Sequence, residues 1–146
     1  MFIVATFFSC KDEYTICDQD LTVAEKSGFY HISGGVEQVG FVPLFTLTAL
    51  GSTTDIYSRA QNLSKFSLPL NPLVDSAKFR LSVGDNYTDT VTFIYSNRSM
   101  TVSANCGIIY IHTLSFVKTT HHKLDSVRIS NRIIDNVSGE NLKIYF

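Results

Sequence analysis

Apolar and polar residues alternate along most of the chain from residue 21 onward. In one segment, Phe79, Leu81 and Val83 are separated by polar or charged residues, so the apolar side chains share one face. A period of two predicts β-strands with one buried face, because successive side chains of a strand point to opposite sides. The clearest segments are 78–83, 90–95, 126–133 and 142–146.

Two further segments, 41–50 and 108–114, are apolar on both faces and are predicted to be central strands. Pro43 lies inside the first, which indicates an edge position, a bulge or two short strands there. Gly-, Pro- and Asn-rich turns separate the segments, and no amphipathic helical stretch exceeds about two turns. The pattern predicts an all-β fold: a single antiparallel β-sandwich of 7–9 strands, immunoglobulin-like or transthyretin-like. A small barrel is the alternative.

Composition narrows the class of protein. The chain has 146 residues, of which 45% are hydrophobic and 17% charged, which excludes a disordered tail. Its formal net charge of -1 gives no basic excess to neutralise phosphates, so we expect no nucleic-acid partner. Phosphate-loop, nucleophile-elbow and zinc-protease motifs are absent from the sequence. We therefore expect no cofactor, no metal site and no catalytic residues.

The amino-terminal residues carry a targeting signal. The apolar run 1–8 is too short to cross a bilayer, which needs about 20 residues, but it fits the end of a signal-peptide core. Ser9-Cys10 then precedes a sudden change to polar residues and resembles a bacterial lipobox, in which the Cys thiol takes a lipid. We expect a signal-peptide remnant at 1–9, a tether lipidated on Cys10 at 10–20 and a β-sandwich domain at 21–146. A hydrophobic first strand is the alternative for the run.

Two other cysteines remain, Cys17 in the tether and Cys106 at the start of a strand. Export would permit a disulfide, so we predict a bond between Cys17 and Cys106, which would pin the tether to the domain. The alternative is that Cys106 is a catalytic nucleophile with His112 or His31 as its base.

The chain carries a series of landmarks in this order: Cys17, Gly28-Phe29-Tyr30, Leu68-Pro69-Leu70-Asn71-Pro72, Thr90-Val91-Thr92-Phe93, Ser103-Ala104-Asn105-Cys106-Gly107 and Asn141 to Phe146. This order resembles a domain-of-unknown-function family of Bacteroidota cell-envelope lipoproteins. The resemblance implies a secreted, lipid-anchored β-domain on the outer membrane, periplasmic or surface-exposed, and it supplies no catalytic residues. Lys11-Asp12-Glu13 is similar to the signal that sends some of these lipoproteins to the cell surface; an ordinary solvated tether is the other interpretation.

Three short motifs match the Bacteroidota O-glycosylation pattern of Asp, then Ser or Thr, then an apolar residue. Their acceptors are Ser76, Thr90 and Ser126.

The sequence thus favours a non-catalytic envelope lipoprotein that contacts the membrane through the lipid on Cys10. Its further partner would be an envelope protein or a glycan. The alternatives are a cell-surface glycan-binding module and a Cys/His hydrolase.

Overall fold

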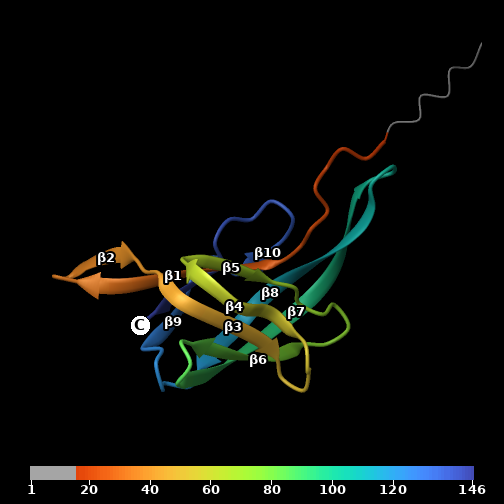
Figure 1. Cartoon of the computed structure of the whole chain (residues 1–146). Helices are drawn as coiled ribbons and strands as arrows, with labels where there is room; N and C mark the ends of the chain where they lie inside the picture. The colour runs from red at the N-terminus through yellow and green to blue at the C-terminus, as the bar shows by residue number, and fades with distance from the viewer. Residues whose placement is uncertain (1–15) are drawn as a thin grey trace, which may run out of the picture.

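The computed structural model describes residues 16–146 and shows an all-β protein. The expectations for residues 1–9 and for Cys10 lie outside these described residues. Figure 1 shows the strands, whose bounds are β1 (Glu25–Ser33), β2 (Val36–Val39), β3 (Val42–Ala49), β4 (Asp55–Leu63), β5 (Lys65–Leu68), β6 (Ser76–Val83), β7 (Tyr87–Ser103), β8 (Gly107–Thr119), β9 (Ser126–Ile129), β10 (Ile133–Ile134) and β11 (Leu142–Tyr145).

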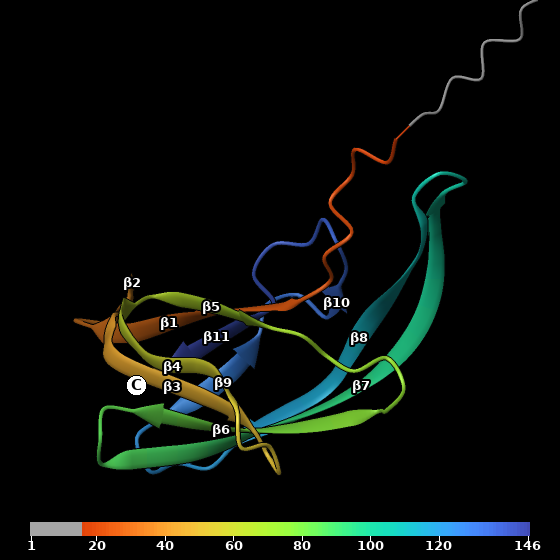
Figure 2. The ribbon, with the colours of Figure 1, turned by 45° about the vertical axis from the view of Figure 1, so that its right-hand side comes forward.

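The strands form two sheets packed face to face, as Figure 2 shows. The small sheet has the order β2-β1-β11-β9, with β5 also paired to β1, and the large sheet has the order β10-β8-β7-β6-β3-β4. The predicted β-sandwich is confirmed, and the sheets do not close into a barrel. Residues 16–146 hold eleven strands where the pattern predicted 7–9, because β2 is exposed along its whole length and β10 has only two residues, so neither shows an alternation.

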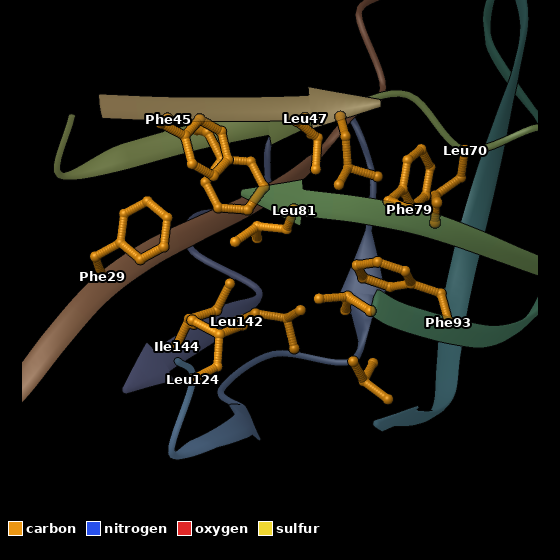
Figure 3. Packing of buried hydrophobic residues seen from close by; sticks show 14 of the residues in the cluster. Phe29, Phe45, Leu47, Leu70, Phe79, Leu81, Phe93, Leu124, Leu142 and Ile144 are labelled. Carbon is orange, nitrogen blue, oxygen red and sulfur yellow. The ribbon is translucent and has the colours of Figure 1, made fainter. Parts of the chain in front are cut away.

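The alternating residues form the core between the sheets. Phe79, Leu81 and Val83 are buried on one face of β6, while Arg80 between them is exposed and Ser82 is half-buried. Phe79 packs edge-on against Phe93 of β7, with ring centroids 5.7 Å apart. Phe29 of β1 and Phe45 of β3 make a similar contact across the two layers, at 5.4 Å (Figure 3). The core is therefore built from inward-facing residues of both sheets, as in other aligned sandwiches.

The strand at the carboxyl end lies inside the small sheet. β11 pairs with β1 on one side and with β9 on the other, so its Leu142 and Ile144 are buried. The β1–β11 pair is parallel, which differs from the purely antiparallel expectation. These two strands come from opposite ends of the described chain and are connected through the whole large sheet. Their relative direction is therefore free of the antiparallel constraint that a short hairpin imposes.

The segment 126–133, predicted as one strand, is divided between the two sheets. β9 belongs to the small sheet, whereas β10 pairs with β8 in the large one. The fully buried Asn141 organises the crossing, since its carbonyl accepts hydrogen bonds from the amides of Ser130 and Asn131. Its side-chain amide donates to the carbonyl of Ile133 at 2.8 Å. Local alternation could not show this change of sheet.

Pro43 lies within β3, which is an interior strand of the large sheet. Pairing of β3 with β6 begins only at Phe45, so Pro43 has a strand neighbour on one side alone, β4. The missing amide hydrogen of proline is therefore not needed for the β3–β6 ladder.

Shortening Ile144 should destabilise the fold strongly, because its side chain is 1% exposed in the middle of the small sheet. We expect Ile144→Ala to lower the free energy of unfolding by about 2–5 kcal/mol in urea titrations. The control is Val137→Ala at a position 80% exposed, which should change it by less than about 0.5 kcal/mol. Equal stability of the two variants would show that β11 is peripheral.

Candidate functional site

A two-stranded arm projects from the sandwich (Figures 1 and 2). We define the arm as residues 96–111. β6 last pairs with β7 at Ile94, and β10 last pairs with β8 at His112. Beyond these points β7 and β8 have only each other as strand neighbours, down to the turn at 104–106. An isolated two-stranded ribbon is only marginally stable in water, so the tip of the arm needs another support.

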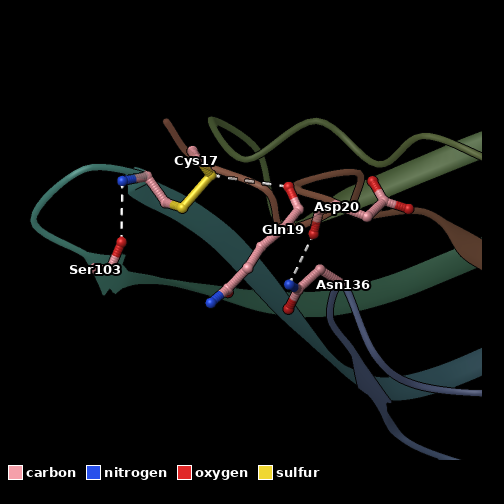
Figure 4. Close-up of a disulfide and its surroundings, with 6 residues drawn as sticks. Cys17, Gln19, Asp20, Ser103 and Asn136 are labelled. Carbon is pink, nitrogen blue, oxygen red and sulfur yellow. Dashed lines mark hydrogen bonds between the residues drawn. A yellow bond between two sulfur atoms is a disulfide. The ribbon is translucent and has the colours of Figure 1, made fainter. Parts of the chain in front are cut away.

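A disulfide supplies that support. Cys17 and Cys106 are bonded, with their Cα atoms 4.9 Å apart, and Cys106 lies in the turn at the tip (Figure 4). The predicted bridge is confirmed. In the same turn the amide of Cys106 donates to the Ser103 hydroxyl at 3.0 Å. The bond closes a loop with a sequence separation of 89, for which chain entropy gives a stabilisation of at most about 4–5 kcal/mol.

The tether residues have a second attachment to the sandwich. The side-chain amide of Asn136 donates to the carbonyl of Asp20 at 2.9 Å, as Figure 4 also shows. The amide of Thr22 donates to the Asp20 carboxylate at 2.8 Å. The chain between Cys17 and β1 is thus held at the arm tip and again near the body of the domain.

The structure does not bring the residues of the hydrolase alternative together. Cys106 is bonded to Cys17 and so has no free thiol. His112 is six residues further along an extended strand, roughly 20 Å away. It is buried, its Nδ1 lies 2.5 Å from Oδ1 of Asn97, and burial lowers its pKa, which favours the neutral ring. His31 lies in the β1–β2 hairpin, paired with Gln38.

The outer face of the small sheet carries a cluster of aromatic and charged side chains, which we call the tyrosine face. Tyr30 of β1 and Tyr145 of β11 are neighbours, with ring centroids 6.1 Å apart. The hydroxyl of Tyr145 donates to Glu37 at 2.6 Å, and Lys143 forms an ion pair with the same carboxylate. The hydrogen bond with Lys143 is the main cause that lowers the pKa of Glu37.

Glu140 completes the tyrosine face. The Tyr30 hydroxyl donates to both of its carboxylate oxygens, at 2.9 and 3.0 Å. Burial and this hydrogen bond raise the pKa of Tyr30 to about 12. A Cβ atom on Gly28 would lie 2.2 Å from the Glu140 carboxylate, so only glycine leaves room for this arrangement.

Two carboxyl groups are buried in the fold, and they differ in charge state. The sequence predicted burial of neither. Glu25 of β1 is fully buried. Among the described residues its carboxyl group accepts a hydrogen bond from the Ser27 hydroxyl at Oε1, at 2.8 Å, while Oε2 has no partner. Burial raises the pKa of Glu25 to about 8, so the group is mostly protonated at neutral pH. A charged residue in an alternating strand normally marks the solvent side, so its type gave no signal of burial.

Asp89 of β7 is buried but remains charged. Burial alone would raise its pKa, but the amides of His122, Lys123 and Leu124 and the Thr120 hydroxyl donate to the carboxylate. Together these hydrogen bonds lower the pKa of Asp89 to about 2. The carboxylate thereby fixes the 120–124 loop against β7. Across residues 16–146, no three His, Cys, Asp or Glu side chains meet in a group that could hold a metal ion.

Comparison with known proteins identifies a family. The model of a family of unknown function, DUF6452, matches residues 45–146. The chain belongs to this family. No curated protein and no solved structure matches the chain.

The DUF6452 match runs from β3 to the end of β11 and includes the whole arm with Cys106, whereas Cys17 and β1 lie before it. The expected resemblance to a family of unknown function is thereby confirmed at that level. In the part of this DUF6452 chain that the structure describes, no helix is long and apolar enough to cross a membrane.

The three expected glycan acceptors differ in accessibility. Ser76 and Ser126 are exposed at the first positions of β6 and β9. Thr90 is half-buried within β7, where its amide donates to the Thr120 hydroxyl oxygen at 2.9 Å. Only the two serines are freely presented to a modifying enzyme, and their modification stays a prediction.

Neutralising Glu25 permanently should change how stability depends on pH. The pKa is raised in the folded state from an ordinary value near 4.5 to about 8. The folded protein therefore holds a proton that the unfolded chain loses, and wild-type stability falls as pH rises through this window. We expect the free energy of unfolding of Glu25→Gln, relative to that of wild type, to increase between pH 4.5 and 8 by up to about 1.4 kcal/mol per pH unit.

Urea titrations at several pH values measure this difference, and the exposed Asp125→Asn serves as the control, since it should follow the wild-type curve. Parallel curves for Glu25→Gln and wild type would mean that Glu25 is ionised in the folded protein.

Proposed function

We propose that the protein is a non-catalytic, lipid-anchored protein of the bacterial cell envelope, held in the outer membrane by a lipid on Cys10. Its sandwich would be presented to an envelope partner or would support an envelope assembly. The observation that carries the proposal is the Cys17–Cys106 disulfide. Disulfides persist in oxidising compartments such as the periplasm and the cell surface, and they are rare in the cytosol.

The position of the disulfide supports the same role. It fastens the chain seven residues after Cys10 to a projecting part of the domain, so an anchor on Cys10 would be joined covalently to the arm. The change from apolar to polar residues at Ser9-Cys10 supports the lipid site. Bacteroidota as the source, with Lys11-Asp12-Glu13 as a surface signal, belongs to this proposal.

The non-catalytic part of the proposal is supported by the side chains themselves. The one cysteine considered as a nucleophile is bonded, and the histidine nearest to it in sequence is buried and turned to Asn97. The polar clusters around Glu37 and around Asp89 form ion pairs and hydrogen bonds within the fold.

Cys10→Ala should release the protein from the membrane. In bacterial cells that process lipoproteins, we expect the wild type in the membrane fraction, with an intact mass that includes two or three acyl chains, enough for stable anchoring. The matched control is the double variant Cys17→Ala with Cys106→Ala, which should remain lipidated and membrane-bound. A soluble, unmodified wild type would contradict the proposal.

A glycan-binding role is a second candidate, favoured by the tyrosine face. Tyr145 borders a hollow of about 560 Å³ that is also lined by Glu37, Arg128 and Ser126, so an aromatic ring adjoins several polar groups that could bind hydroxyls. Opposing this, the hydroxyls of both tyrosines are already bound to carboxylates, and Lys143 lies over the Tyr30 ring at 4.5 Å.

Screening against envelope polysaccharides tests this candidate. If it is correct, Tyr145→Ser should weaken binding about tenfold through loss of an aromatic contact worth roughly 1.4 kcal/mol. The control Tyr87→Ser removes a half-exposed tyrosine from another part of the surface and should bind like wild type. If wild type binds no polysaccharide, this candidate is wrong.

A further inference from the structure

One face of the arm is exposed and carries large apolar side chains. Ile108 and Tyr110 are two residues apart on β8, so they share a face, and they are 62% and 48% exposed. Their partners across the ribbon are Thr101 and Ser99, both exposed. The opposite face differs, since Ile109 and Ile111 are only 5% and 3% exposed. We call the exposed side, with Ile108 and Tyr110 at its centre, the outer arm face.

The apolar character continues across the disulfide. Ile16, next to Cys17, is 87% exposed and lies at the same tip because Cys17 is bonded to Cys106. Apolar side chains in water lack the favourable free energy that their burial would contribute. Exposed apolar residues that gather in one place therefore mark an interaction surface.

The charge of the arm indicates which kind of partner the outer arm face binds. Residues 96–111 contain no Asp, Glu or Lys, and Arg98 is their only charged side chain. The remaining exposed groups are mainly hydroxyls, which hydrogen-bond well to polar headgroups. Tyrosine with an aliphatic neighbour is typical of the membrane–water interface, where the ring meets acyl chains and the hydroxyl stays hydrated. The absence of carboxylates avoids repulsion by anionic lipids.

The short tether favours a lipid surface over other partners, because it keeps the arm tip close to the bilayer. From Cys10 to Cys17 the chain advances seven residues, which reach at most about 25 Å when fully extended. A lipid on Cys10 therefore keeps the arm tip within that distance of the bilayer surface. The apolar residues of the tip are thus the part of the described domain that the anchor holds nearest to lipid.

We propose that the outer arm face docks on the bilayer interface, so that the disulfide fixes the orientation of the sandwich with the arm toward the membrane. The inference rests on the proposed lipidation of Cys10. The lipid and the arm then form two membrane attachments, and the tyrosine face and core sheets are displayed away from the arm tip.

A single tryptophan reports on this contact, because the natural chain has none. Lipidated Ile108→Trp protein is reconstituted in vesicles of phosphatidylethanolamine and phosphatidylglycerol with brominated acyl chains, which quench only an indole that reaches them. The matched control is Tyr87→Trp, because Tyr87 is also half-exposed and starts the same 17-residue strand, roughly 50 Å from the tip.

We expect the Ile108→Trp emission to lose most of its intensity in brominated vesicles and the Tyr87→Trp emission to be unaffected. Adding Cys17→Ser and Cys106→Ser should abolish most of the quenching, since the tip is then no longer held near the lipid. Tyr110→Trp places a second reporter on the same face in case Ile108→Trp does not fold, and it should behave alike.

Flotation of the vesicles separates the possible failures. Protein that floats with unquenched emission from Ile108→Trp keeps the anchor but overturns the arm contact. A shift of that emission to shorter wavelength without bromine quenching shows that a protein, such as a second copy, covers the face, and this also overturns the inference. Protein that carries no acyl chains and does not float overturns the proposed lipid anchor, and the arm contact with it.

Discussion

The small sheet depends on one strand at the end of the chain. β11 pairs with β1 on one side and with β9 on the other, and without it β9 would have no connection to the layer that β1 forms with β2 and β5. It also places Leu142 and Ile144 against the large sheet, so the sandwich has its second layer only when both ends of the domain have met. Such pairing between sequence-distant strands costs chain entropy before it yields contacts, which predicts slow folding for this topology.

The sequence predicts those strands in which apolar and polar residues alternate. Period-two segments correctly indicate β6, β7 and β11 and their buried faces, because burial on one side of a strand requires apolar residues at every second position. It does not reveal the parallel β1–β11 pair or the change of sheet between β9 and β10. Both are set by partners far away in the chain, such as Asn141, whose type at its own position carries no such information.

In the functional region, too, the sequence predicts some features and not others. Cysteines are chemically distinctive, so the pairing of Cys17 with Cys106 could be expected once Cys10 was assigned to the lipid and export was expected. The arm could not, since nothing in the alternation shows where β7 and β8 lose their outer neighbours. The burial of Glu25 could not be predicted either, because it depends on the sheet that packs over the carboxyl group.

The disulfide also changes what cleavage of the chain would do. Residues 17–106 form a covalent ring that contains β1 to β7 and the exposed loops at 50–54, 71–75 and 84–86. Exposed loops are preferred sites of proteolytic nicking. A protease that cuts once inside the ring opens it but separates nothing, because both fragments stay joined through sulfur and through the paired strands. A protein exposed to envelope proteases would thus keep its domain attached to its amino-terminal segment after such a cut.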